Sequence, residues 1–308
     1  MAATVMTSRL LRTMLAPGRK QTISNKNHEV KTVVTVSRAS GDIAGFPTEA
    51  GKHARNDVPG FSRRRRRPHR LGPGQNARFR SHDSATPSVS VVIPTLDEAE
   101  NIAYVLRRIP HWVEETIIVD GHSSDNTVAI AKEARPDVVI VYQEGRGKGD
   151  AISAGCRAAT GDIVVLLDAD GSTDPAEIPR FVTALRTGGD FAKGTRFMVG
   201  GGSADITWIR SVGNKGLARL VNVLFGAKFT DLCYGYFAFW RRCLPDLSID
   251  CDGFEVEALI AVRALRANIR VVEVPSFETP RLHGTSKLSA RRDGIRIVRT
   301  IIAEWLRP

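Results

Sequence analysis

Cysteine and long apolar runs are both scarce in this sequence. The four cysteines, Cys156, Cys233, Cys243 and Cys251, form no CxxC pair and have no companion histidine cluster. Zinc sites and disulfide frameworks need such patterns, so we predict free thiols in a reducing compartment. The longest apolar candidate, Leu217 to Phe229, contains Arg219, Asn222 and Lys228. A membrane-spanning helix needs about 18 consecutive apolar residues, so none is predicted.

Acidic residues are scarce over positions 1–87. This segment holds 17 lysines and arginines against 5 acidic residues, with an unbroken arginine run from 63 to 67. It shows no sustained apolar period, so we predict a disordered basic tail over 1–87. The alternatives are a nucleic-acid or anionic-lipid patch in the arginine run, a transit peptide in the first 28 residues, and an extension from a misplaced start codon.

The remainder of the chain, 88–308, is close to neutral, with 27 basic and 28 acidic residues. It also lacks aromatic residues interleaved with basic ones. Proteins that bind nucleic acid usually combine a basic surface with aromatic stacking positions. We therefore predict no nucleic-acid partner.

From Ser88 onward, short β-branched runs alternate with helical patterns, which is typical of a parallel α/β sheet. Asp125 is the expected cap of the second helix. Repeated strand–helix units joined by short links predict a Rossmann-like, doubly wound, mainly parallel sheet. Strands are expected at 88–94, 115–120, 137–143 and 162–167, and helices at 98–109, 126–135 and 149–159.

The residues that follow each predicted strand are polar. They are PTLDE at 94–98, DGHSSD at 120–125, EGRGKG at 144–149 and DADG at 168–171. Ligands of open α/β sheets bind at the carboxyl ends of the strands. We therefore expect these four segments to converge on one site.

Asp168 and Asp170 have the chemistry of a Mg²⁺ or Mn²⁺ site, because these ions take oxygen ligands and only one or two protein carboxylates. The glycines at 145, 147 and 149, with Arg146 and Lys148, could present N–H groups and cations to anionic oxygens. GRGKGD lacks the spacing of a Walker A loop, and no GxGxxG follows the first strand. A metal-bound nucleotide diphosphate is the ligand that this set favours.

Seven segments follow one another along the chain: PTLDEAENI at 94–102, VDGHSSDNT at 119–127, GRGKGDA at 145–151, LLDADGSTDP at 166–175, GTRF at 194–197, DLCYGYFAF at 231–239 and RLHGTSKL at 281–288. In this order they resemble the glycosyltransferase family 2 enzymes, most closely the dolichol- or polyprenyl-phosphate sugar transferases. The resemblance implies a GT-A fold over 88–308, with a nucleotide-sugar half at 88–175 and a C-terminal acceptor-binding half at 176–308.

The resemblance also assigns site residues. Two positions depart from the family pattern: Gly121 replaces a second aspartate, and Asp97 replaces an asparagine, which leaves the bound base open. The donor-binding residues that it implies are Pro94, Thr95, Glu98, Asp120, Lys148 and Asp168, with Asp168 and Asp170 on the metal. Those implied for binding the acceptor or the phosphates are Arg196, Arg210, Ser286 and Lys287, the last two in a segment that closes over the phosphates, and those implied for catalysis are Asp231 and Arg281.

The implied reaction is inverting transfer of a hexose from a UDP- or GDP-sugar, assisted by Mg²⁺ or Mn²⁺, to polyprenyl phosphate. A phosphate acceptor is already ionised, with a second pKa near ~6, so it needs no base. A sugar or small-molecule hydroxyl acceptor is the alternative, with Asp231 as the base. A sugar nucleotidyltransferase is a further alternative, although its glycine-rich loop would follow the first strand, where this chain has PTLDEAEN.

Two features of the acceptor half are left open by the sequence. Glu257 either caps a core helix or lines the acceptor cleft. A helix at 290–306 places Ile295, Val298, Ile302 and Trp305 on one face with arginines nearby. This face either packs on the sheet, which we favour, or lies on an anionic membrane. We accordingly expect a cytoplasmic protein, free or bound peripherally to the cytoplasmic face of the membrane.

Overall fold

The structure is a computed structural model and describes residues 86–308, so the tail expected at 1–87 lies outside the described residues except for Thr86 and Pro87. The strands are β1 (Val89–Thr95), β2 (Glu115–Asp120), β3 (Val139–Tyr142), β4 (Ile163–Leu166), β5 (Phe191–Thr195), β6 (Gly202–Ser203), β7 (Phe237–Trp240), β8 (Val271–Pro275) and β9 (Phe277–Glu278). The α-helices are α1 (Ala99–Arg108), α2 (Thr127–Ala134), α3 (Gly147–Ala158), α4 (Ile178–Arg186), α5 (Trp208–Phe225), α6 (Leu244–Leu247), α7 (Val256–Arg266) and α8 (Ala290–Leu306).

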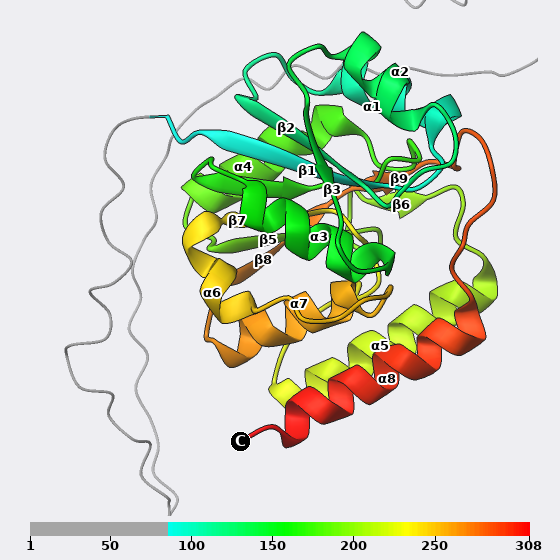
Figure 1. Cartoon of the computed structure of the whole chain (residues 1–308). Coiled ribbons are helices and arrows are strands. Elements are labelled where there is room, and N and C mark those ends of the chain that lie inside the picture. Colours follow the sequence, from blue (N-terminus) through cyan, green and yellow to red (C-terminus); the bar gives the residue numbers. More distant parts are fainter. Residues whose placement is uncertain (1–85) are drawn as a thin grey trace, which may run out of the picture. The chain divides into compact units, whose positions relative to one another are not determined.

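Seven strands form one mixed sheet in the order β3-β2-β1-β4-β7-β5-β8 (Figure 1). Strand β7 is antiparallel to both β4 and β5, and the other pairs are parallel. Helices cover a parallel sheet on both faces, and the almost continuous Val and Ile runs of β1 and β4 are buried accordingly. The predicted α/β, mainly parallel sheet is confirmed. Because β1 to β4 are parallel, their polar carboxyl ends meet at one edge.

Helices α3 and α4 pack directly on the sheet, α3 against β1, β2 and β3 and α4 against β5 and β7. In α1, the buried residues Ile102, Val105 and Leu106 are spaced three and four apart, which places them on one helix face. A second sheet contains only β6 and β9, paired in parallel. It lies beside the site described below, because Glu278 of β9 lines the same cleft.

Helix α7 lies between the sheet and a pair of outer helices, α5 and α8 (Figure 1). Its Val256 and Ile260 join the main core, whereas Ala261 and Val262 pack with Ile297 and Ile301 of α8. The expected packing of the 290–306 helix on the sheet is therefore wrong. The helix packs on α5 and α7 instead, through a different face from the one at Ile295, Val298, Ile302 and Trp305. Within 86–308, no helix combines the length and apolar character needed to span a bilayer.

Local boundaries differ from the prediction where tertiary contacts intervene. Helix α3 begins at Gly147 rather than 149, and β3 spans only Val139–Tyr142. A Cβ atom on Gly149 would lie 2.1 Å from the carbonyl oxygen of Cys251, so a glycine is needed where α3 meets this backbone. The cap of α2 is Asn126, although the Asp125 carboxylate accepts a hydrogen bond from the N–H of Thr127.

Candidate functional site

A cleft of about 1020 Å³ opens at the carboxyl ends of β1 to β4. Its lining comes from the ends of these strands, from the 279–289 segment and from helices α3, α5, α7 and α8. Among the expected site residues, those that line it are Pro94, Thr95, Glu98, Lys148, Asp168, Asp170, Arg210, Arg281, Ser286 and Lys287. The three that do not line it are Asp120, Arg196 and Asp231.

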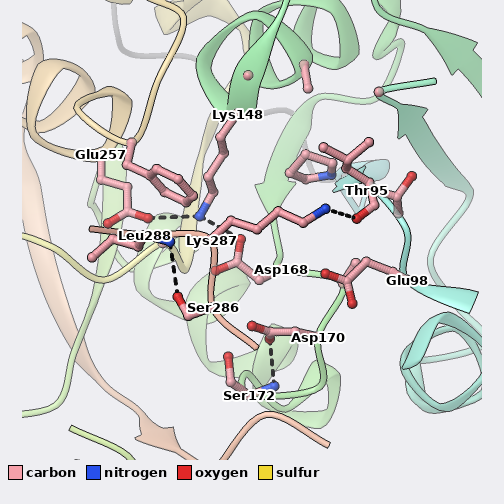
Figure 2. Close-up of a pocket in the computed structure, with 18 of the residues that line it drawn as sticks. Thr95, Glu98, Lys148, Asp168, Asp170, Ser172, Glu257, Ser286, Lys287 and Leu288 are labelled. Atoms are coloured by element: carbon pink, nitrogen blue, oxygen red, sulfur yellow. Dashed lines mark hydrogen bonds and ion pairs between the residues drawn. The ribbon is translucent and has the colours of Figure 1, made fainter. Parts of the chain in front are cut away.

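Asp168 and Asp170 follow the buried strand β4, and both carboxylates face the cleft (Figure 2). The Lys148 Nζ atom lies 2.7 Å from Asp168 Oδ1, and Arg281 Nη2 lies 3.1 Å from Asp170 Oδ2. The backbone N–H of Ser172 donates to Asp170 Oδ1 at 2.9 Å, which fixes the carboxylate. Two carboxylates from one strand end are thus held together in the cleft.

Lys148, near the N-terminus of α3, lies between Asp168 and Glu257 (Figure 2). Burial disfavours its charge, but the two carboxylates outweigh this effect and raise the pKa of Lys148 well above its ordinary value. Burial raises the pKa of Asp168; Asp170 and Glu257 add to this, and Lys148 opposes it. Glu257 thus lines the cleft with its side chain, 2.9 Å from Lys148, which decides between the two interpretations left open by the sequence.

The charge of this end of the cleft suits a divalent cation. Four carboxylates, those of Glu98, Asp168, Asp170 and Glu257, lie against only two cations, Lys148 and Arg281. The set carries an excess of two negative charges when all groups are ionised. Oxygen ligands with uncompensated negative charge are what Mg²⁺ and Mn²⁺ require, so the residues present fit such an ion.

The 279–289 segment crosses the cleft from β9 to α8 and is attached to the start of α1. Arg281 donates to both oxygens of Glu98, at 2.9 and 3.1 Å. Asn101 accepts from the N–H of His283 at 3.0 Å and donates to its carbonyl oxygen at 3.2 Å. Lys287 donates to the carbonyl oxygen of Leu96 at 2.8 Å. The segment therefore brings Arg281, Ser286 and Lys287 over the strand ends, as the motif suggested.

Asp120 has a structural position rather than one in the cleft. It is buried at the end of β2, where it accepts from the N–H and hydroxyl of Ser123 at 2.9 and 2.6 Å. Its expected contact with the donor is therefore not supported. Gly121 lines the cleft instead, and a Cβ there would lie 3.2 Å from the side-chain oxygen of Gln143, which lines it too.

Arg196 and Asp231 form a buried ion pair, and neither residue lines the cleft. Arg196 Nε and Nη2 donate to Asp231 at 2.8 and 3.0 Å, and Nη1 donates to Glu278 at 3.1 Å. Asp231 has 0% exposed surface. Burial raises its pKa, but Arg196 and Lys193 outweigh burial and hold the pKa below its ordinary value. Each side chain is thus engaged by the other in this structure, and the expected roles of Asp231 as a base and Arg196 as a phosphate ligand stay predictions.

The lining of the cleft also includes cations from two helix starts. Arg210 lies in the first turn of α5, with Asp205 at 3.4 Å, and Arg292 lies in the first turn of α8. The sequence analysis found Arg210 but missed Arg292, which belongs to no motif. The expected amphipathic helix at 290–306 was the only signal for it. The lining of the cleft thus combines carboxylates of the strand ends with cations of two helix starts.

Comparisons with known proteins agree with this architecture. The family model of glycosyl transferase family 2 matches residues 90–247. A polyprenol monophosphomannose synthase of Mycolicibacterium smegmatis is 33% identical over 250 residues, covering 76% of this chain and 94% of that protein. A dolichol-phosphate mannosyltransferase of Pyrococcus furiosus is 31% identical, covering 66% of this chain and 60% of that protein.

The fold is shared with a solved enzyme of a different name. The glucosyl-3-phosphoglycerate synthase of Mycobacterium tuberculosis, in complex with Mg²⁺ and UDP, matches with a TM-score of 0.59 at 22% identity. The match covers 72% of this chain and 80% of that one. The sheet order and the paired carboxylates after β4 agree with the family match. The chain therefore belongs to glycosyl transferase family 2 and is a glycosyltransferase.

Proposed function

We propose that this glycosyltransferase moves a hexose from a UDP- or GDP-sugar to polyprenyl phosphate, with inversion at the anomeric carbon. The names of the mannose-transferring relatives support a lipid-phosphate acceptor. The donor end of the cleft is built on Thr95, Glu98 and Lys148, and the acceptor end on Arg210 and Arg292.

In this proposal, Asp168 and Asp170 hold Mg²⁺ or Mn²⁺. When bound, the ion would neutralise charge on the departing nucleoside diphosphate. Lys148 and Arg281 stand beside the two carboxylates and stabilise the same developing charge through the protein's own cations. The 279–289 segment orients the donor phosphates through Ser286 and Lys287.

The acceptor is inferred from the surroundings of the carboxylates. The carboxylates of the 176–308 half that line the cleft are all paired: Asp205 with Arg210, Glu278 with Arg196, and Glu257 with Lys148. A hydroxyl acceptor would need a free base, whereas a phosphate monoester is ionised near neutral pH and can attack unaided. The cations Arg210 and Arg292 and the lack of a free carboxylate among those three residues favour the phosphate.

The single observation that carries the proposal is one cleft whose lining includes two carboxylates at the end of β4 and the cations Arg210 and Arg292. The test is a donor screen of the full chain with Mn²⁺ or Mg²⁺, each common UDP- or GDP-sugar and polyprenyl phosphate. We expect release of nucleoside diphosphate and formation of a lipid-linked sugar, both abolished by EDTA. Turnover that produces pyrophosphate from a nucleoside triphosphate and a sugar phosphate would instead identify a nucleotidyltransferase.

A further inference from the structure

Helix α5 exposes large apolar side chains that the fold does not use. Trp208, Ile209 and Val223 are 77%, 70% and 74% exposed, and Val212 is half exposed. Ile209, Val212 and Val223 repeat at intervals close to whole helical turns, so they share one side of α5. The buried residues Asn214, Ala218 and Val221 occupy the opposite side. The outer side of α5 is therefore apolar without packing against the core.

Helix α8 likewise has one buried apolar side and one exposed apolar side. Its buried side carries Ile297 and Ile301, which pack with α5 and α7. Ile295, Val298 and Trp305 are exposed and, with the partly buried Ile302, follow the helical period on another side. Because α5 and α8 lie next to each other as the outer helices (Figure 1), both apolar sides belong to the same layer of the protein.

The exposed charges of these two helices are all of one sign. On α5 they are Lys215 and Arg219 with the partly exposed Arg210, and on α8 they are four arginines. The carboxylates of α8, Asp293 and Glu304, are buried. Lys215, Arg219, Arg291 and Arg299 form no ion pair with any residue of 86–308. A surface that combines apolar side chains with unpaired cations complements an anionic lipid surface.

This layer begins at the cleft. Arg210 and Arg292, in the first turns of α5 and α8, line the acceptor end, and Trp208 and Ile209 lie beside Arg210. A lipid whose phosphate enters at Arg210 and Arg292 would leave its hydrocarbon chain outside the cleft, where the apolar side chains lie. Apolar chain and anionic head would each meet a matching surface.

We infer that the outer side of α5 and α8 is a docking surface for an anionic lipid bilayer. The inference deepens the proposed function and depends on it only for the lipid-phosphate acceptor. We call this surface the α5–α8 face; it comprises Trp208, Ile209, Val212, Lys215, Arg219, Val223, Arg291, Ile295, Val298, Arg299, Ile302 and Trp305. Trp305 suits the interface of a bilayer, because an indole has an apolar body and a polar N–H.

Tryptophan fluorescence tests this inference on the full chain. The four tryptophans are at 112, 208, 240 and 305, so residues 1–87 contribute none, whatever their own attraction to anionic lipid. The probe is a vesicle of phosphatidylglycerol and brominated phosphatidylcholine, whose bromine quenches tryptophans that enter the acyl region. We expect quenching in the unmodified protein and in Trp112→Phe, and loss of most of it in the Trp208→Phe/Trp305→Phe double variant.

A charge variant tests whether the cations of the α5–α8 face attract the anionic lipid. Arg219→Glu/Arg299→Glu should shift the lipid concentration for half-maximal quenching upward by about tenfold or more in about 0.1 M salt. The matched control, Arg107→Glu/Lys132→Glu, changes exposed cations of α1 and α2. It should leave the lipid concentration for half-maximal quenching unchanged. Circular dichroism melting of each variant verifies that it is folded.

The inference is overturned if the unmodified protein shows no quenching, whether or not it sediments with the vesicles. It is also overturned if the double tryptophan variant is quenched as strongly as Trp112→Phe, since the contact then lies elsewhere. A dimer in light scattering that disappears in Ile209→Ser/Val212→Ser would assign the face to a second copy of the chain. The vesicles contain neither donor nor acceptor, so failure here is distinct from failure of the proposed transfer.

Discussion

The charged residues of the two halves, 88–175 and 176–308, include groups with different surroundings. In the 88–175 half, Glu98, Lys148 and Asp170 face the cleft, and Asp120 is the exception. In the 176–308 half, Arg196 and Asp231 are buried in an ion pair away from the cleft, although the motifs placed them in the site. The first group is available for ligands. The second group holds the 231–236 segment, because Arg196 also donates to the carbonyl oxygen of Cys233, which lines the cleft.

This difference separates residues that bind from residues that position. A buried pair contributes to activity by maintaining the fold, and its loss should lower stability. A cleft carboxylate should affect ligand binding and leave the fold intact. The variants below test this division from the largest expected effect to the smallest.

Asp231→Asn should be the most destabilising change. It removes one charge of a buried ion pair and leaves the Arg196 guanidinium with Glu278 alone, and breaking such a pair typically costs about 3–5 kcal/mol in the free energy of unfolding. Urea unfolding followed by circular dichroism measures this loss. The control is Asp137→Asn, whose carboxylate is exposed and should change stability by less than about 0.5 kcal/mol.

The same carboxylate gives a pH dependence. Its folded pKa lies below the ordinary value of 3.8, so its stabilising effect is complete above that pH and is lost as the pH falls through the lower, folded pKa. Asp231→Asn should therefore flatten the acid limb of stability below about pH 4. Loss of transfer in this variant with unchanged stability would restore Asp231 as the base.

Asp170→Asn should abolish metal-dependent donor binding and lower turnover by about 10²–10³, because it removes a hard ligand and a charge at the diphosphate site. Titration calorimetry with Mn²⁺ and the donor measures this. Asp205→Asn, at the acceptor end of the same cleft, should retain donor affinity. Equal donor affinity in Asp170→Asn and the unmodified protein would contradict the metal assignment.

Gly149→Ala should destabilise the seam between the two halves by about 1–3 kcal/mol, since the added Cβ meets the backbone of Cys251. Thermal unfolding is the measurement. Gly216→Ala on α5 is the matched control: nothing lies within 4 Å of its Cβ position, and alanine favours the helix. A Gly149→Ala protein as stable as the control would show that the contact between Gly149 and the Cys251 backbone is not tight.

Arg292→Ala should have the smallest effect, a rise of about tenfold in KM for polyprenyl phosphate with unchanged donor affinity. Arg292→Lys should recover part of the loss, because it keeps the charge. Steady-state kinetics with the acceptor varied provide the test. An unchanged KM would remove Arg292 from the acceptor site.

The 88–175 half was predictable because its functional side chains follow strands directly. Parallel strands bring their ends to one edge, so Lys148 and Asp168 could be placed from order along the chain alone. Asp120 is the exception. It also follows its strand, but the N–H and hydroxyl of Ser123, three residues on, donate to its carboxylate, and it does not line the cleft.

The 176–308 half was less predictable because its geometry depends on distant contacts. Arg196 resembles a phosphate ligand until Asp231, 35 positions away, is placed against it. Arg292 reaches the cleft only because Ile297 and Ile301 dock α8 on α7. Burial of that kind is set by tertiary packing, and no local pattern in the sequence records it.

The central claim is that the acceptor group is a phosphate, and one measurement tests it most directly. The full chain is given Mn²⁺, the active donor and either polyprenyl phosphate or the unphosphorylated polyprenol of the same length. We predict a sugar-linked lipid from the phosphate and none from the alcohol, because the cleft offers Arg210 and Arg292 for a phosphate. Transfer to the alcohol at a rate equal to that for the phosphate would contradict the account.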